Sequence, residues 1–126
     1  MLRTDAMRFS RGNPSYASLY VLDGALDFLA NYETPAIQSH VQALTGDLHD
    51  RLSAAGIHSS TPRDPGRHGA SICIDGNFEQ KVVDDLHQRG VYIWGGRGRL
   101  RISFHGFNQR SELDTIVGEL LHELRR

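Results

Sequence analysis

The amino-acid sequence predicts an α+β domain, with helices packed on one side of a small, mainly antiparallel sheet. Two observations lead to this class. Leucines recur at helical spacing near both ends of the chain, and short apolar runs with the length of strands lie in its second half. The predicted order is helix, helix, strand, strand, helix, strand, strand, helix, and the length of 126 residues suits one hydrophobic core. We therefore expect residues 1–126 to form a single domain.

Two helices are expected in the first half of the chain. Asn13 and Pro14 have the residue types of a helix cap and a first turn. The apolar residues that follow at helical spacing are Leu19, Leu22, Leu26 and Leu29. Thr34 with Pro35 repeats the start signal, and Gly56 supplies the stop. Between them the apolar residues again repeat in steps of three and four: Ile37, Val41, Leu44, Leu48 and Leu52.

In the second half, turn-forming residues separate short apolar runs. Two prolines make residues 57–67 a predicted loop, with a possible short strand at its start, Ile57 to Ser60. The other expected elements are strands at 70–74, 91–94 and 100–104 and helices at 78–89 and after 111. Gly95 to Gly98 has turn chemistry, so the last two strands should form a hairpin. Ser111 and Asp114 have the spacing of a capping box for the last helix.

Composition and charge exclude several classes of protein. Apolar residues make up 39% and charged residues 23%, as in ordinary globular domains, which excludes disorder, collagen and coiled coil. Fourteen basic and fifteen acidic side chains give a net charge of −1, which favours neither nucleic acid nor an anionic membrane as partner. No apolar run approaches the roughly 20 residues of a membrane span. We expect a cytoplasmic protein.

Three kinds of reactive side chain are expected to be structural. The seven histidines form no pair at metal-binding spacing, so no metal site is expected. Cys73, between isoleucines in a predicted strand, is interpreted as a small buried hydrophobe and not as a nucleophile. Lys81 is the only lysine among the fourteen basic residues, and its position on a predicted helix indicates a solvated side chain.

The strongest candidate site lies in the segment GGRGRLRISFHGFN, residues 95–108. In a strand, alternate residues share a face, and one face then carries Arg99, Arg101, Ser103 and His105. The planar fork of arginine suits a carboxylate or a phosphate group, so this face can hold an anionic ligand. The alternative interpretation is a solvated strand face beside a glycine turn.

Three stretches of the chain together resemble the C-terminal region of class V aminotransferases, which are pyridoxal-phosphate enzymes of fold type I. They read RFSRGNPSYASLYVLDGALDFL, HGASICI and RGVYIWGGRGRLRISFHGFN. The resemblance covers nearly the whole chain, and the group is loosely called isopenicillin N epimerase-like or cysteine desulfurase-like. It implies the small C-terminal domain of such an enzyme, with the fold predicted above.

The most specific part of the resemblance is an Arg-X-Ser-X-X-X-aromatic-Asn pattern, met by Arg101, Ser103, Phe107 and Asn108. In such enzymes the arginine at this position binds the α-carboxylate of the amino-acid substrate. The resemblance therefore implies that Arg101 binds the substrate, with Ser103 and Asn108 as supporting motif residues. The second choices are Arg99 and Arg97.

The turn Gly12-Asn13-Pro14 resembles the family's Gly-Thr-Pro-like turn, with asparagine in place of threonine. In the family this turn approaches the cofactor phosphate of the neighbouring subunit. The resemblance thus implies a contact of Gly12 and Asn13 with that phosphate.

The resemblance implies substrate recognition without catalysis. The family's Schiff-base lysine, the acidic partner of the pyridine nitrogen and the histidine that stacks on the cofactor lie in a large domain upstream of the matched part. We therefore expect no catalytic residue here, pyridoxal phosphate only in the complete enzyme, and no activity of the isolated chain. The loop from Trp94 to Leu100 has no cysteine, where desulfurases carry a catalytic one, which disfavours a desulfurase.

Two functions remain open at this point. One is substrate recognition in a transaminase, epimerase or lyase that acts on an amino acid. The other is a free-standing module with the same fold that binds an anion or a protein. A homodimer is also expected, because the first helix and its neighbours Phe9, Tyr16 and Tyr20 would lose the cover that the family's large domain provides.

Overall fold

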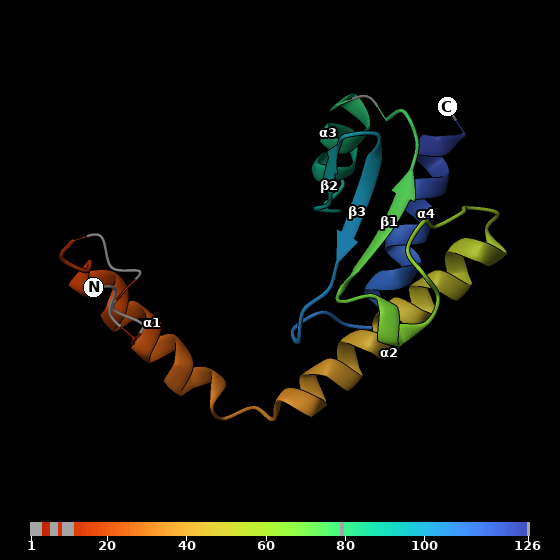
Figure 1. Cartoon of the computed structure of the whole chain (residues 1–126). Coiled ribbons are helices and arrows are strands. Elements are labelled where there is room, and N and C mark those ends of the chain that lie inside the picture. The colour runs from red at the N-terminus through yellow and green to blue at the C-terminus, as the bar shows by residue number, and fades with distance from the viewer. Residues whose placement is uncertain (1–3, 6–7, 9–11, 79, 126) are drawn as a thin grey trace. The chain divides into compact units, whose positions relative to one another are not determined.

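The computed structural model describes residues 4–5, 8, 12–78 and 80–125 (Figure 1). The chain divides into two compact units, Met1–Thr34 and Pro35–Arg126. The sequence-based expectation of one domain over residues 1–126 stays a prediction. None of the helices in the described part of the chain is long and apolar enough to cross a membrane.

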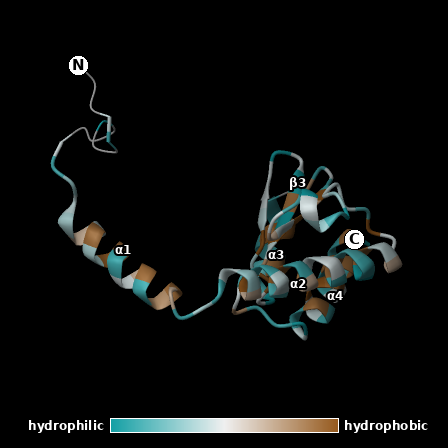
Figure 2. Cartoon of the chain, turned by 60° about the horizontal axis from the view of Figure 1, so that its bottom comes forward, coloured by the Kyte–Doolittle hydropathy of each residue, from teal (hydrophilic) through white to brown (hydrophobic). Residues whose placement is uncertain are grey.

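The first unit contains helix α1, Tyr16–Leu29. Its N-cap is Ser15, whose hydroxyl accepts a hydrogen bond from the Ser18 amide at 3.5 Å. The helix cap expected at Asn13 is therefore wrong by two residues. Ser15 caps the helix instead, because it stands three positions before Ser18, whose amide lies in the first turn and needs a partner outside the helix. Apolar residues, brown in Figure 2, recur along α1, and none of its residues is buried.

The second unit contains an antiparallel sheet of three strands in the order β1-β3-β2. Its elements are α2 (Thr34–Ala54), β1 (Ser71–Asp75), α3 (Gln80–Gln88), β2 (Trp94–Gly96), β3 (Arg99–Ser103) and α4 (Glu112–Leu124), with a short 3₁₀ helix, η2 (Pro65–Arg67). One face of β1 and β3 is buried and the other is not, because buried residues alternate along both strands. The predicted α+β class is confirmed.

The core lies between the buried face of the sheet and helices α2, α3 and α4. The leucine stripe of α2 is confirmed, since Val41, Leu44, Leu48 and Leu52 are buried. Ile72 and Ile74 of β1, with Leu100 and Ile102 of β3, supply the sheet side of the core. Burial of these aliphatic side chains is the main favourable contribution to folding in this unit.

The hairpin between β2 and β3 has a two-residue loop, Arg97 and Gly98. Both residues have positive φ, 53° and 73°, and Gly96 pairs with Arg99 across the loop. Positive φ at both central positions characterises the type I′ turn that suits hairpins. Gly95, expected in the turn, belongs to β2, where a Cβ would stand 2.3 Å from a methyl group of Val83 in α3.

The strand expected at 91–94 is shifted, since β2 begins at Trp94, and the possible short strand at Ile57 to Ser60 is absent from the described structure. Residues 91–93 form no strand, because the Val91 amide donates to the Leu86 carbonyl at 2.9 Å and so helps to end α3. His87 Nε2 likewise donates to the Ile93 carbonyl at 2.9 Å. Residues 57–60 form no strand either, although the Ser60 amide donates to the Cys73 carbonyl at 3.0 Å.

The capping box expected at the start of α4 is also wrong. Ser111 makes no side-chain cap. Instead, the Glu112 carboxylate accepts from the Gln109 amide at 2.9 Å. Asp114 is engaged elsewhere, in a bond to Arg51 of α2.

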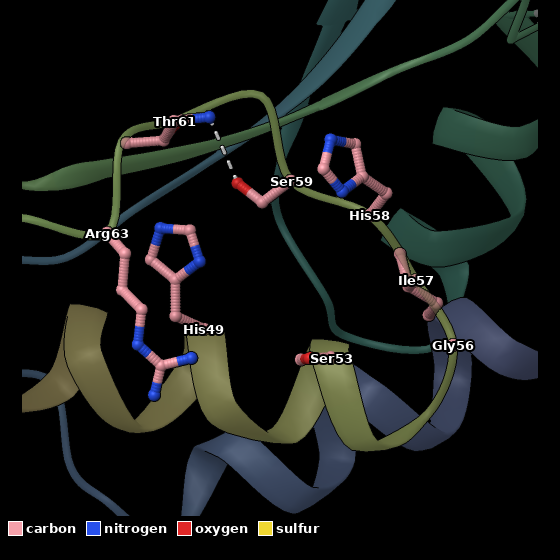
Figure 3. Close-up of a pocket in the computed structure, with 8 residues that line it drawn as sticks. All are labelled: His49, Ser53, Gly56, Ile57, His58, Ser59, Thr61 and Arg63. Atoms are coloured by element: carbon pink, nitrogen blue, oxygen red, sulfur yellow. Dashed lines mark hydrogen bonds between the residues drawn. The ribbon is translucent and has the colours of Figure 1, made fainter.

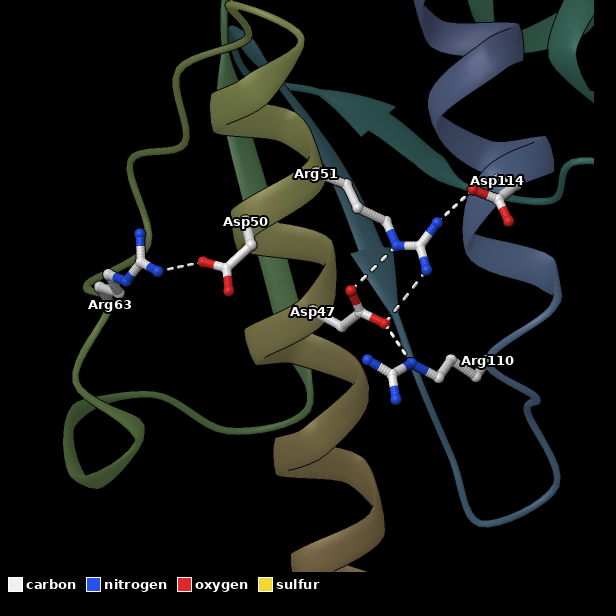
Figure 4. A network of polar contacts seen from close by, with 6 residues as sticks. All are labelled: Asp47, Asp50, Arg51, Arg63, Arg110 and Asp114. Atoms are coloured by element: carbon white, nitrogen blue, oxygen red, sulfur yellow. Dashed lines mark hydrogen bonds and ion pairs between the residues drawn. The ribbon is translucent and has the colours of Figure 1, made fainter.

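A polar network joins α2 to α4 and to the segment before α4 (Figure 4). Asp47 accepts from Arg51 Nε at 2.9 Å and from Arg110 Nε at 2.5 Å, and Arg51 also bonds Asp114. The hydrogen bond from Arg51 lowers the pKa of Asp47 below its usual value, with a smaller contribution from Arg110 and an opposing one from burial. The carboxylate of Asp47 therefore binds its partners in the charged form.

Substitution by alanine should change the stability of the chain in opposite directions at Gly98, in the hairpin loop, and at Gly46, in α2. Gly98→Ala places a Cβ at φ 73° and should destabilise the chain by about 1–2 kcal/mol. Gly46→Ala, in α2 with open space around the new Cβ, should stabilise it by about 0.5–1 kcal/mol. Urea unfolding of both variants measures the difference, and equal effects would contradict the turn geometry.

Asp47→Asn should make the stability of the chain less sensitive to acid. The folded-state pKa of Asp47 lies below its usual 3.8, so its contribution is present above that value and is lost as the pH falls through the folded-state pKa. We expect the variant to be less stable than the parent at neutral pH, with a difference that shrinks below the usual pKa. Urea unfolding across pH checks this.

The matched control is Asp50→Asn, on the same helix. Asp50 is exposed and bonds one arginine, Arg63. Surface pairs of this kind contribute little, so the control should lose less stability than Asp47→Asn. An equal loss of stability in the two variants would show that the contact of Asp47 with two arginines contributes no more to the free energy of unfolding than the single surface pair of Asp50.

Candidate functional site

Strand β3 presents the predicted site residues on one face. Arg99, Arg101 and Ser103 are exposed, whereas Leu100 and Ile102 between them are buried. The alternation expected from the sequence is confirmed. The core contacts of the two buried residues fix which way the arginines point.

Arg101 lies at the centre of this open face. It is opposite Cys73 of β1 on one side and opposite Trp94 of β2 on the other. Its guanidinium carbon lies 5.0 Å from the centroid of the Trp94 ring, which is a cation–π distance. Among the described residues, no carboxylate forms an ion pair with Arg101. The cation is therefore positioned by an aromatic ring, and no described carboxylate neutralises it.

The two second-choice arginines differ from Arg101. Arg99 Nε lies 3.6 Å from Asp75 Oδ1, and the two residues are directly opposite in the register of β1 and β3. Arg97 is exposed in the type I′ turn, away from the strand positions. The structure thus brings Arg99 and Arg101 onto one face and leaves Arg97 at its end.

Ser103 and Asn108 hold the backbone around the site. Ser103 Oγ lies 2.9 Å from Ser71 Oγ and so links β3 to β1. Asn108 Oδ1 accepts from the His105 amide at 2.8 Å, and Asn108 Nδ2 donates to Glu112 at 3.0 Å. His40 Nε2 of α2 donates to the Asn108 carbonyl at 2.9 Å. Asn108 therefore connects the end of β3 to α4 and α2.

Phe107, the aromatic residue of the motif, is exposed. Its ring stacks on that of His105, with centroids 5.2 Å apart and planes 25° apart. Gly12 and Asn13 lie in the first unit and are exposed. Their implied contact with a cofactor phosphate stays a prediction. Phe9 lies outside the described residues.

Cys73 is not in the core, contrary to expectation. It is half-buried and lies on the same face as Arg101. The reason is the alternation of the strand: Ile72 and Ile74 both point into the core, so the residue between them must face the other way. The alternation of Ile72, Cys73 and Ile74 in the sequence would have been sufficient to predict that Cys73 faces away from the core.

Lys81 is 71% exposed and pairs with Asp85 one turn along α3, as expected for a solvated helix residue. The described residues contain no group of three or more histidine, cysteine, aspartate or glutamate side chains that could hold a metal ion.

Trp94 is the site residue that the sequence analysis missed. A two-residue loop at 97–98 sets the pairing of Gly96 with Arg99, and counting back along the hairpin then places Trp94 opposite Arg101. The signal was present in the glycine-rich turn, but it required the turn to be assigned to the correct two residues.

Comparison with known proteins identifies the family. Residues 1–116 match the family described as aminotransferase class-V. A probable cysteine desulfurase of Vibrio cholerae is 21% identical over 126 residues, which covers 90% of this chain and 31% of the relative. A probable cysteine desulfurase of Halobacterium salinarum is 27% identical, with 87% and 30% covered. The chain spans about a third of the length of these curated relatives.

Solved structures show the same fold. A cysteine desulfurase from Thermococcus onnurineus superimposes with a TM-score of 0.84 at 18% identity, over 95% of this chain and 34% of that protein. The cysteine desulfurase CsdA from Escherichia coli gives 0.82 at 22% identity, over 98% and 34%. The expected fold of the C-terminal region of fold-type I enzymes is thereby confirmed. Because the family match covers most of its length, the chain belongs to the class V aminotransferase family of pyridoxal-phosphate-dependent enzymes.

Proposed function

We propose that this chain recognises the amino-acid substrate in a class V aminotransferase-like enzyme, and that Arg101 binds the substrate's α-carboxylate. The observation that carries the proposal is the guanidinium of Arg101 on the open face of the sheet, in contact with Trp94 and without a carboxylate partner among the described residues. An unneutralised arginine on a rigid strand suits bidentate binding of a carboxylate.

The surroundings of Arg101 support this choice over its neighbours. The strands on both sides restrict the backbone of Arg101, which lowers the cost of ordering its side chain when a ligand binds. Arg99 would have to leave Asp75, or divide its N–H donors between Asp75 and the substrate carboxylate. Arg97 stands on a turn and has no neighbouring strand to position it.

The cofactor proposed for the complete enzyme is pyridoxal phosphate. The described residues do not by themselves fit this group, because the only lysine, Lys81, is solvated and already paired with Asp85. A lysine that binds such a cofactor must be desolvated or placed beside other cations. We therefore assign no catalytic step to this chain, and its proposed contribution is substrate binding and orientation.

The substrate and the reaction are proposed only as a class. Transamination, epimerisation and lyase chemistry on an amino acid all require recognition of the α-carboxylate. The relatives named as cysteine desulfurases make cysteine one candidate substrate. The loop from Trp94 to Leu100 carries no thiol for sulfur transfer, which favours the other chemistries.

Arg101→Lys tests the proposal in a complete enzyme that contains this region. Lysine keeps the charge but loses the planar fork, so substrate affinity should fall by about 1.5–3 kcal/mol, roughly 10- to 150-fold, while the thermal midpoint changes little. Binding of the amino acid is measured by calorimetry. The matched control Arg99→Lys should have a smaller effect because Asp75 already occupies that arginine.

Two results would contradict the proposal. If Arg101→Lys leaves substrate affinity unchanged and Arg99→Lys or Arg97→Lys abolishes binding, the carboxylate is held by the second-choice residue. If all three variants bind normally, the open face is a solvated strand face and the proposed function is wrong.

We also propose that the chain forms a homodimer through α1. The exposed apolar residues of this helix include Tyr20, 77% exposed, and Val21, 73% exposed. A shallow hollow on the same helix is lined by Leu19, Tyr20, Leu22, Asp23 and Leu26. A helix of 14 residues is marginally stable alone in water, so α1 needs an apolar partner, and the net charge of −1 opposes pairing only weakly.

Sedimentation equilibrium of the purified chain should give a dimer at micromolar concentration. Leu22→Lys should shift the distribution to monomer, because it places a charge in the apolar hollow. Ala17→Lys adds the same charge to α1 at a residue that does not line the hollow, and should leave the dimer intact. A clean monomer of the parent chain would contradict the proposal.

A further inference from the structure

Two glycines, Gly95 and Gly96, come directly before the turn of the β2–β3 hairpin, and each leaves room for a side chain. A Cβ at Gly95 would stand 2.3 Å from a methyl group of Val83, so glycine lets β2 pack directly on α3. A Cβ at Gly96 would stand 3.0 Å from Cζ2 and 3.2 Å from Cη2 of Trp94. The ring of Trp94 therefore lies along its own strand, over the place that a side chain at Gly96 would occupy.

The Trp94 ring lies on the open face of the sheet, beside Arg101. The two residues are directly opposite in the register of β2 and β3, and 5.0 Å separates the guanidinium carbon from the ring centroid. Although β2 is an edge strand, Trp94 is only 42% exposed. The ring thus packs against the sheet and does not project into solvent.

The strand on the other side of Arg101 is held at its outer edge. Cys73, opposite Arg101 in β1, accepts at its carbonyl from Ser59 Oγ at 2.9 Å and donates from its amide to Thr61 Oγ1 at 2.8 Å. Ser59 Oγ also accepts from the Thr61 amide at 3.1 Å, and this segment lines a cavity together with His49 of α2 (Figure 3). With the backbone fixed on both sides, the main freedom left to Arg101 is that of its long side chain.

A cation–π contact can restrict this side chain without using its binding capacity. The ring attracts the cation through its quadrupole, so it does not cancel the charge or occupy the N–H donors as a carboxylate does. Arg99 shows the contrast, because its Nε lies 3.6 Å from Asp75 Oδ1 and a ligand carboxylate would compete with that group. An aromatic neighbour therefore suits an arginine that has to bind an anion.

We propose that Trp94 is a positioning residue for Arg101: its ring holds the guanidinium ready for the α-carboxylate and so raises the affinity for the substrate. This inference rests on the carboxylate-binding role proposed above for Arg101. Ordering a long side chain during binding costs free energy, and an arginine that already lies against a ring has less freedom to lose. Gly96 contributes indirectly, because a larger residue would take the place of the ring.

Trp94→Leu and Trp94→Phe, in a complete enzyme that contains this region, test the proposal. Both variants keep an apolar side chain, but only phenylalanine keeps an aromatic face. Affinity for the amino acid, measured by calorimetry, should fall roughly two- to tenfold in Trp94→Leu, which corresponds to the ordering of one long side chain. The loss should be smaller in Trp94→Phe. A purely structural role would lower the thermal midpoint of both variants and would not separate their affinities.

The contact itself can be followed in this chain, because Trp94 is its only tryptophan. Arg101→Gln removes the cation beside the indole and should change the fluorescence of Trp94. The matched control is Arg97→Gln, which removes the same charge from the turn of the same hairpin and should leave the fluorescence unchanged. Unchanged fluorescence in Arg101→Gln, or an equal change in the two variants, would overturn the proposed contact.

The binding results distinguish this inference from the proposed function. If Arg101→Lys weakens binding and Trp94→Leu does not, the arginine needs no positioning by the ring, and the inference is wrong while the proposed function stands. Equal losses in Trp94→Leu and Trp94→Phe would also overturn the inference, because the aromatic face would then have no role. If Arg101→Lys binds the substrate normally, the proposed function fails and the inference fails with it.

Discussion

The antiparallel pairing of β3 with both β1 and β2 is the constraint on which the rest of the structure depends. It commits Leu100 and Ile102 to the core, and a slip of one residue would turn every side chain of β3 to the opposite face. With that register, Arg101 must stand on the open face between Cys73 and Trp94. The position of the proposed carboxylate-binding residue is thus a consequence of burying its two aliphatic neighbours.

Polar contacts then attach this strand to the helices behind it. Asn108 binds the backbone at the end of β3, the first residue of α4 and, through its carbonyl, His40 of α2. Asp47 and its two arginines connect α2 and α4 a few turns further along. Through its contacts Asn108 fixes the chain direction after the strand that carries Arg101.

The sequence by itself determined the features that local periodicity encodes. These include the α+β class, the leucine stripe of α2, and the alternation that separates Arg99 and Arg101 from Leu100 and Ile102. The tertiary structure decided features that depend on distant partners: Val91 ends α3 instead of extending β2, and His49 meets a loop that β1 holds in place. A short window of sequence does not predict such contacts, because their partners come within hydrogen-bond distance only when the chain has folded around its core.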